Sequence, residues 1–243
     1  MSSELSEEDH PPIPDAEPWN SIEQCRYEKE VISTYLSGHP LDDYKYEMRY
    51  FTNIRCAELA NLEALNGREV RFAGMVSDAV EGKNSQGEPY GSIVINDYSG
   101  NYKLRLKGDE YSDFSGFFKN DTFVFVKGTV IVRPYVDKAG INKVFTKIRI
   151  GAMMNLSSVM ERYTSRLNFK VNLTDIDEAF CKSIEKLSKK HKGKVPLQAT
   201  VLDITHNLSL TLGGDNLRVD PRSLIPELEK LHGISEIKPQ VKS

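Results

Sequence analysis

The sequence predicts a mixed β and α+β protein, in which a helical lead segment precedes two small domains. The chain has 243 residues and 39% hydrophobic residues, enough for two small cores. The spacing of apolar residues changes from a period of about 3.6 to a period of 2 near residue 68, and becomes mixed after Gly151. We therefore expect a flexible acidic linker at 1–22, a helical connector at 23–66, a β domain at 67–151 and an α+β domain at 152–243.

Charge is distributed unevenly along the chain. Residues 1–22 contain six acidic residues and four prolines, a composition typical of a linker, and residues 1–66 together carry 14 Asp/Glu against 5 Lys/Arg. Residues 67–150 and 151–243 each carry a net charge of +3. Neither later region is basic enough to clamp DNA by charge alone, so we expect any nucleic-acid binding to be weak and sensitive to salt.

The lead segment shows helical spacing. Apolar residues recur at this spacing over 22–36, and the run ends at a stop signal formed by Gly38, His39 and Pro40. A second short helix is expected at 42–50.

The β domain contains five segments with period-2 alternation: 69–76, 90–97, 102–107, 123–132 and 143–150. The connection between the third and fourth is long enough for a short helix and carries aromatic residues for packing. Five strands with a helix in this position predict a five-stranded OB-fold barrel. The longest connections, 77–89 and 133–142, fall between strands 1 and 2 and between strands 4 and 5, where OB folds bind their ligands.

The last region predicts a small α+β domain in the order β-α-β-β-β-α. Its first helix is expected to begin at Thr174 as N-cap, with Asp175, Asp177 and Glu178 in the first turn, and to end near Gly193. A final helix begins at Asp220-Pro221 and runs to Leu231. The expected strands are 168–173, 197–204, 207–212 and 217–219.

No combination of residues predicts catalysis, a cofactor or a metal. The Gly82–Ser85 stretch lacks the earlier glycine of a phosphate-binding loop, and the five histidines show no metal-binding spacing. The paired Asp175 and Asp177 are explained by helix capping. Three distant cysteines, no signal peptide and no apolar run long enough for a membrane predict a cytoplasmic protein without a membrane partner.

A binding surface is the remaining candidate site. In the third strand Lys103, Arg105 and Lys107 alternate with apolar residues, so pleating places three cations on one face, where they could follow a phosphate backbone. An edge strand protected by solvated lysines explains the same pattern. Further cations and one aromatic residue in the long connections could add charge and stacking, or could simply be solvated. They are Lys83, Arg133, Tyr135 and Lys138.

A second cluster of lysines, between 186 and 194, has two explanations. It could contact nucleic acid, but cations at the end of a helix also interact favourably with the helix dipole. We favour the second.

Several short segments resemble one family. The segments at 28–30, 35–41 (YLSGHPL), 95–100 (INDYSG), 119–122 and 126–128 resemble the region around the OB domain of the bacterial DNA polymerase III alpha subunit, the C-family replicative polymerase. The similarity extends from about residue 19 to 150 and continues more loosely to 233.

The resemblance implies a non-catalytic C-terminal fragment of a DNA-directed DNA polymerase, a nucleotidyltransferase of the replisome. The polymerase regions that precede this point in the family are not in this sequence, and would be the remainder of the subunit. The resemblance also implies that the OB domain contacts single-stranded template DNA and that the last domain docks the tau subunit of the clamp loader. The clamp-binding peptide is not found, so sliding-clamp contact is not predicted. The alternatives are an OB-containing protein-protein interaction module without DNA binding and, less favoured, a nuclease or phosphatase.

Overall fold

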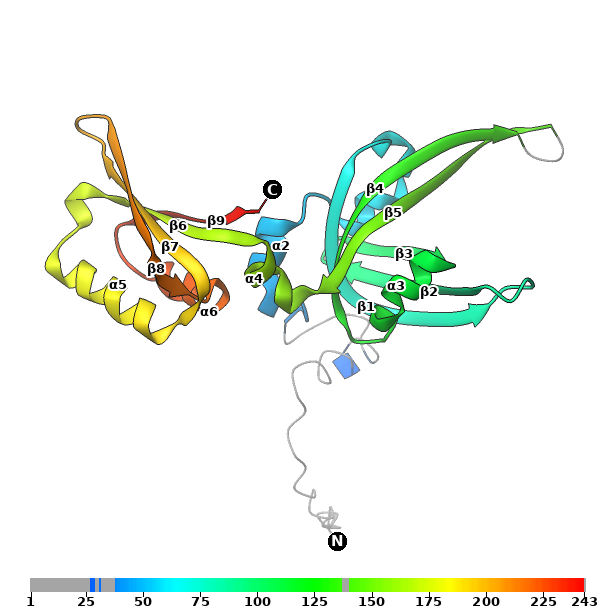
Figure 1. Ribbon diagram of the computed structural model, residues 1–243, viewed down its shortest axis with the longest axis horizontal. Helices are drawn as coiled ribbons and strands as arrows, with labels where there is room; N and C mark the ends of the chain where they lie inside the picture. Colours follow the sequence, from blue (N-terminus) through cyan, green and yellow to red (C-terminus); the bar gives the residue numbers. More distant parts are fainter. Residues whose placement is uncertain (1–26, 29–30, 32–37, 137–139, 243) are drawn as a thin grey trace, which may run out of the picture. The chain divides into compact units, whose positions relative to one another are not determined.

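The computed structural model describes residues 27, 28, 31, 38–136 and 140–242. The chain divides into two compact units, Met1–Pro40 and Leu41–Ser243. The second unit contains two β-sheets, each with its own helices (Figure 1). The expected linker at 1–22 and nearly all of the expected helix at 22–36 lie outside the described residues.

The first sheet has the strand order β3-β2-β1-β4-β5, with every neighbouring pair antiparallel. β1 pairs with β4 through Glu69–Met75 and with β2 through Met75–Lys83, so one long strand joins both halves of the sheet. This order, with a helix between β3 and β4, is that of the OB fold, a partly open barrel. β3 and β5 are the two edges and do not pair over the described residues. The strands are β1 (Glu69–Lys83), β2 (Pro89–Asp97), β3 (Gly100–Lys107), β4 (Phe123–Val136) and β5 (Asn142–Asn155).

The expected strand centres are present, but two expected loops are mostly strand. β1 continues to Lys83, and β4 continues to Val136 opposite the first residues of β5. The connection predicted at 77–89 is therefore a hairpin with a short turn. Most of the segment predicted at 133–142 belongs to the β4–β5 hairpin, whose paired strands form a long two-stranded ribbon (Figure 1). The alternating apolar residues predict only the central part of each strand, and hydrogen bonds to the neighbouring strand continue it beyond them.

The helix expected after β3 is present as α3 (Asp109–Phe114), followed by a 3-10 helix (Ser115–Phe117). Tyr111, Phe114 and Phe117 pack against the core of the first sheet, and Phe118 is buried in it. The sheet contributes the alternating apolar residues of all five strands to this core. They include Phe72, Ile93, Leu104, Val126 and Ile148.

The residues before β1 close one end of this core and link it to the β2–β3 turn. Cys56 and Leu59, in the 3-10 helix Cys56–Ala60, are fully or almost fully buried there. Asp97 accepts hydrogen bonds on Oδ2 from the Cys56 backbone N–H at 2.8 Å and on Oδ1 from the Ser99 N–H at 2.7 Å. The turn that carries the INDYSG sequence is thereby fixed to the lead segment.

The second sheet has the order β8-β7-β6-β9. β6 and β7 are parallel and are joined through α5, as a parallel pair requires a crossover, while the other two pairs are antiparallel. The elements are α2 (Lys45–Phe51), α4 (Val159–Tyr163), β6 (Thr164–Asn172), α5 (Glu178–Lys190), β7 (Lys192–Asp203), β8 (Leu208–Val219), α6 (Pro221–Leu228) and β9 (Ile234–Val241).

Four details of the sequence prediction are wrong here. The N-cap of α5 is Asp177, whose carboxylate accepts from the Phe180 N–H at 2.7 Å, and Thr174 lies in a preceding 3-10 turn. The strands expected at 207–212 and 217–219 are one strand, β8. The final helix ends at Leu228 rather than Leu231, and β9 follows it, so the order is β-α-β-β-α-β.

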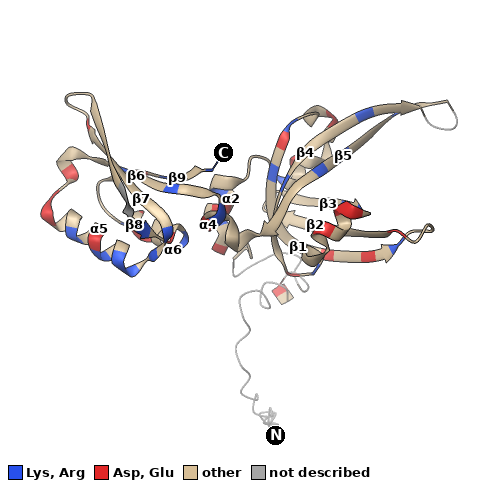
Figure 2. Cartoon of the chain, in the orientation of Figure 1, with Lys and Arg blue, Asp and Glu red and all other residues tan. Residues whose placement is uncertain are grey.

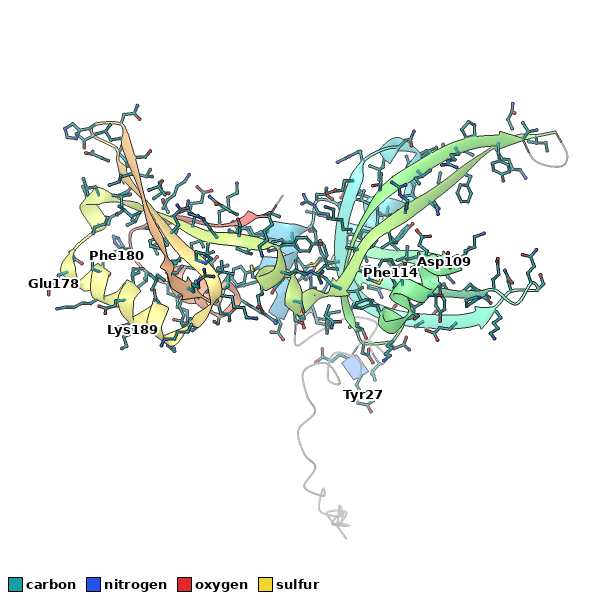
Figure 3. The ribbon with its side chains drawn as sticks, viewed as in Figure 1. Tyr27, Asp109, Phe114, Glu178, Phe180 and Lys189 are labelled. Atoms are coloured by element: carbon teal, nitrogen blue, oxygen red, sulfur yellow. The ribbon has the colours of Figure 1, made fainter. Side chains whose placement is uncertain are left out.

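Helices α5 and α6 cover one face of the second sheet. The apolar side of α5 (Phe180, Ile184, Leu187) packs with Leu224 of α6 and Phe169 of β6. Charged ends suit the dipole of α5, since Glu178 lies in its first turn and Lys189 in its last (Figure 3). The same core extends to α2 and to Ala73 and Phe125 of the first sheet.

Among the described helices, none combines the length and the apolar character that a membrane crossing needs.

Candidate nucleic-acid interface

The three cations predicted on the third strand share one exposed face of β3. Lys103, Arg105 and Lys107 are exposed, whereas Leu104 and Leu106 between them are buried in the barrel core. β3 is an edge strand, paired only with β2 among the described residues. In the described part of the chain, no carboxylate oxygen lies within 4.0 Å of a side-chain nitrogen of these three cations, so none of them forms an ion pair there. Their charges are therefore available to a ligand.

Tyr90 of β2 belongs to the same face. It lies directly opposite Lys107, and residues opposite each other on antiparallel strands point to the same side of the sheet. On the other side Tyr90 is paired with Gly82 of β1, where an added Cβ would lie 3.1 Å from the tyrosine ring. The ring thus lies over a residue without a side chain and is 39% exposed. The sequence prediction missed Tyr90.

The predicted residues Arg133 and Tyr135 lie on β4 rather than in a loop. Arg133 is opposite Phe145 of β5, and Tyr135 is opposite Lys143, so all four share one face of the β4–β5 ribbon. Val144, between Lys143 and Phe145, belongs to the other face, opposite Pro134. Figure 2 shows Lys and Arg on both strands of this ribbon. One ribbon face therefore alternates cations with exposed aromatic rings.

A groove of about 620 Å³ lies at the open side of the barrel, between the edges β3 and β5. Phe145, which is 48% exposed to solvent, lines it from β5. Tyr90 and the three β3 cations line it as well. The full lining consists of Leu62, Asn84, residues 90–92, residues 102–107, Glu110 and residues 145–148.

The acidic residue of the groove is already engaged. Glu110 of α3 accepts a hydrogen bond from the Ile150 backbone N–H at 3.2 Å, and its other oxygen lies 3.5 Å from Lys147 Nζ. These contacts neutralise Glu110 and Lys147 against each other, which leaves the positive charge of the groove to β3. Burial, with a smaller effect of the nearby Cys56, raises the pKa of Tyr102 to about 12, so this lining residue stays neutral at physiological pH.

Three further predicted residues, all in the described part of the chain, do not line the groove. Lys83 is the last residue of β1 and is paired with Pro89, one position beyond the Gly82–Tyr90 pair, so alternation directs it to the opposite face. Arg133 and Tyr135 lie farther along the ribbon face that Phe145 shares. Lys138 lies outside the described residues.

Tyr90 and Phe145 have no distinguishing signal in the sequence, because each occupies what looks like an ordinary apolar position of a predicted strand. Their exposure follows from strand register and from the unpaired edges of β3 and β5, neither of which has a local sequence signal. No set of three or more His, Cys, Asp or Glu side chains in the described part of the chain is arranged to bind a metal ion.

Strand order and the placement of α3 define the first sheet as an OB-fold domain. In sequence, the chain is similar to the alpha subunit of bacterial DNA polymerase III, which confirms the resemblance seen in its short segments. It is 25% identical over 222 residues to that subunit of Vibrio cholerae, covering 90% of this chain and 18% of the relative. It is 27% identical over 200 residues to the Thermus aquaticus subunit, covering 82% and 15%, and 23% identical over 225 residues to the Escherichia coli subunit, covering 91% and 18%.

The chain spans less than a fifth of the length of these relatives. No family model matches it. Solved structures with some likeness include a small single-stranded DNA-binding protein from Streptomyces coelicolor (16% identity, TM-score 0.23, 37% of this chain and 94% of that chain). Another is a mitochondrial single-stranded DNA-binding protein from S. cerevisiae (10%, 0.27, 37% and 95%). Because these identities and TM-scores are low, the assignment of the OB fold rests on the strand order.

Proposed function

We propose that this chain is the non-catalytic C-terminal part of a replicative DNA polymerase alpha subunit, and that its OB domain contacts single-stranded template DNA. The observation that carries the proposal is the row of Lys103, Arg105 and Lys107 on the exposed face of an edge strand, beside a groove. The polymerase activity belongs to the longer relatives, and we propose that the remainder of such a subunit supplies it.

The cations of this face are suited to bind the phosphate backbone of DNA rather than to recognise a base sequence. Three unpaired cations at successive outward positions of a strand can each approach one phosphate, and such contacts carry no base information. Arg133 and Tyr135 extend the same kind of surface along the ribbon. Lys83 and Lys138 stay predicted contributors of charge. With so few cations, we expect micromolar or weaker affinity for this chain alone.

The test is a titration of a fluorescently labelled, unstructured oligonucleotide with the whole chain. We expect the variant Lys103→Ala/Arg105→Ala/Lys107→Ala to bind more weakly than the wild type. A matched control, Lys182→Ala/Lys186→Ala/Lys190→Ala on α5, removes the same charge elsewhere and should bind nearly as the wild type does. Absence of binding by the folded wild-type chain would instead favour an OB module that serves protein-protein interaction.

We further propose that the second sheet region docks the tau subunit of the clamp loader, as the resemblance implies. The supporting observation is a row of exposed leucines on β8, an edge strand: Leu208, Leu210 and Leu212 are 65%, 60% and 50% exposed. They share the sheet face that α5 and α6 cover elsewhere, since they lie opposite Asp203, Val201 and Ala199 of β7. An uncovered apolar row of this kind is typical of a docking surface.

Replacing the three leucines by serine should weaken tau binding, measured by calorimetry with tau from the same bacterium. Ser209→Ala/Thr211→Ala changes the opposite face of the same strand and serves as the control. If the folded leucine variant bound tau as tightly as the control variant, β8 would not be the docking surface.

A further inference from the structure

We propose that Tyr90 and Phe145 form a base-stacking pair in the groove between β3 and β5, so that single-stranded DNA lies with its bases against these rings and its phosphates along β3. This inference rests on the proposed function, because it assigns the part of the same site that holds the bases.

The two rings come from opposite sides of the groove. Tyr90 belongs to β2, in the row of Lys107, and Phe145 to β5, the other edge of the sheet. Glycine opposite Tyr90 leaves no side chain above the sheet at that point, so the ring lies over the backbone of β1. Tyr90 is 39% and Phe145 48% exposed, whereas Phe72 and Phe125 in the strands between them are almost fully buried. The exposed rings are therefore not required by either core.

Charge and apolar surface are separated within the groove. Among the described lining residues, the cations without an ion pair all come from β3, and the one acid, Glu110, is paired with Lys147. A nucleotide strand has the same separation, with a charged backbone and flat apolar bases. Aromatic side chains bind bases by stacking without regard to sequence, while cations hold the phosphates. The volume of the groove also falls in the range of ligand-binding sites.

The same face continues beyond the groove. Arg133 is opposite Phe145, and Tyr135 with Lys143 forms the next row toward the end of the ribbon. A strand that leaves the groove past Phe145 would therefore meet another cation and another exposed ring. The pattern fits a nonspecific single-strand track, in which stacking residues and cations alternate.

The test uses an oligo(dT) of about 16 nucleotides, the upper end of the site size of one OB fold. We expect Tyr90→Ala and Phe145→Ala each to weaken binding by the whole chain at least about fivefold, without changing the dependence of affinity on salt, because stacking releases no counterions. Tyr90→Phe keeps the ring and should bind within about twofold of the wild type. Val144→Ala, on the opposite face of the same ribbon, is the matched control for Phe145.

A second measurement locates the contact directly. Oligo(dT) containing 5-iododeoxyuridine cross-links on irradiation to an aromatic ring stacked on the base, and mass spectrometry should find the product on Tyr90 or Phe145. If the wild-type chain binds DNA, but the alanine variants bind as tightly as Val144→Ala and the cross-links fall elsewhere, the stacking pair is refuted while the cation face stands. If the wild type binds no DNA, the proposed function fails with it.

Discussion

Glu47 of α2 is a fully buried acid at the contact between α2 and α6. Its Oε1 lies 3.5 Å from Arg222 Nε, and Arg222 also stacks on the Tyr44 ring, 4.6 Å from its centroid. Burial raises the pKa of Glu47 from its ordinary value of 4.5, and nearby Asp220 raises it further, whereas its own backbone N–H and Arg222 act in the opposite direction. Burial therefore disfavours the charged form of Glu47 more than the attraction of Arg222 favours it.

This imbalance predicts a pH dependence of stability. Because the folded pKa lies above the unfolded one, the contribution of Glu47 is most favourable below about pH 4.5 and is lost as the pH rises through the folded pKa. The free energy of unfolding of Glu47→Gln, minus that of the wild type, should therefore increase as the pH rises above about 4.5 in urea titrations. Glu63→Gln, at an exposed position, is the control for removal of a carboxylate. A difference for Glu47→Gln that stays constant with pH would contradict the assignment.

Among the elements, strand centres were predictable and strand ends were not. Alternating apolar and polar residues, as in 102–107, predict a half-buried strand whichever strand it pairs with, because one of its faces is apolar. The outer parts of β1, β4 and β5 carry polar and exposed residues on both faces, and only their partner strand keeps them extended. The sequence did not predict β9, which contains Pro239 and several charged residues, but proline is tolerated on an edge strand such as this one.

The packing of α3 on the first sheet depends on a glycine in β2. A Cβ on Gly91 would lie 2.5 Å from Tyr111 Cε2 and 2.7 Å from Phe118 Cδ1. Gly91→Ala should therefore force both aromatic rings outward and lower the free energy of unfolding by about 1–3 kcal/mol. Gly116→Ala is the control, since nothing lies within 4 Å of a Cβ there. Equal stability of the two variants in denaturant titrations would show that the core accommodates the added methyl group.

For the molecule as a whole, the sequence predicted the OB domain and the α+β character of the region that follows, but not how the lead segment is used. Leu41, Tyr46 and Phe51 join the core of the second sheet, whereas Ile54, Cys56 and Leu59 join the core of the first. One short connector therefore serves two cores, which no local periodicity reveals. The boundaries at 66/67 and 151/152 stay predictions that limited proteolysis can examine.

The candidate site, like the fold, was predictable only in part. Alternation alone placed Lys103, Arg105 and Lys107 on one face, since it needs only the pleat of a single strand. Tyr90 and Phe145 needed the register of β2 and β5 and the open edge between β3 and β5. Those features depend on contacts between residues far apart in the sequence.

The most direct test of the central claim, that the β3 face holds the phosphates of single-stranded DNA, is the salt dependence of binding. Fluorescence anisotropy with an unstructured oligonucleotide gives the slope of log affinity against log salt concentration. Each phosphate neutralised on a single strand contributes about 0.7 to that slope, so Lys103→Ala/Arg105→Ala/Lys107→Ala should flatten it by about 2. The α5 control variant should keep the wild-type slope. If the slopes of the wild type and the β3 variant coincide while both are folded, β3 is a solvated edge and does not hold DNA.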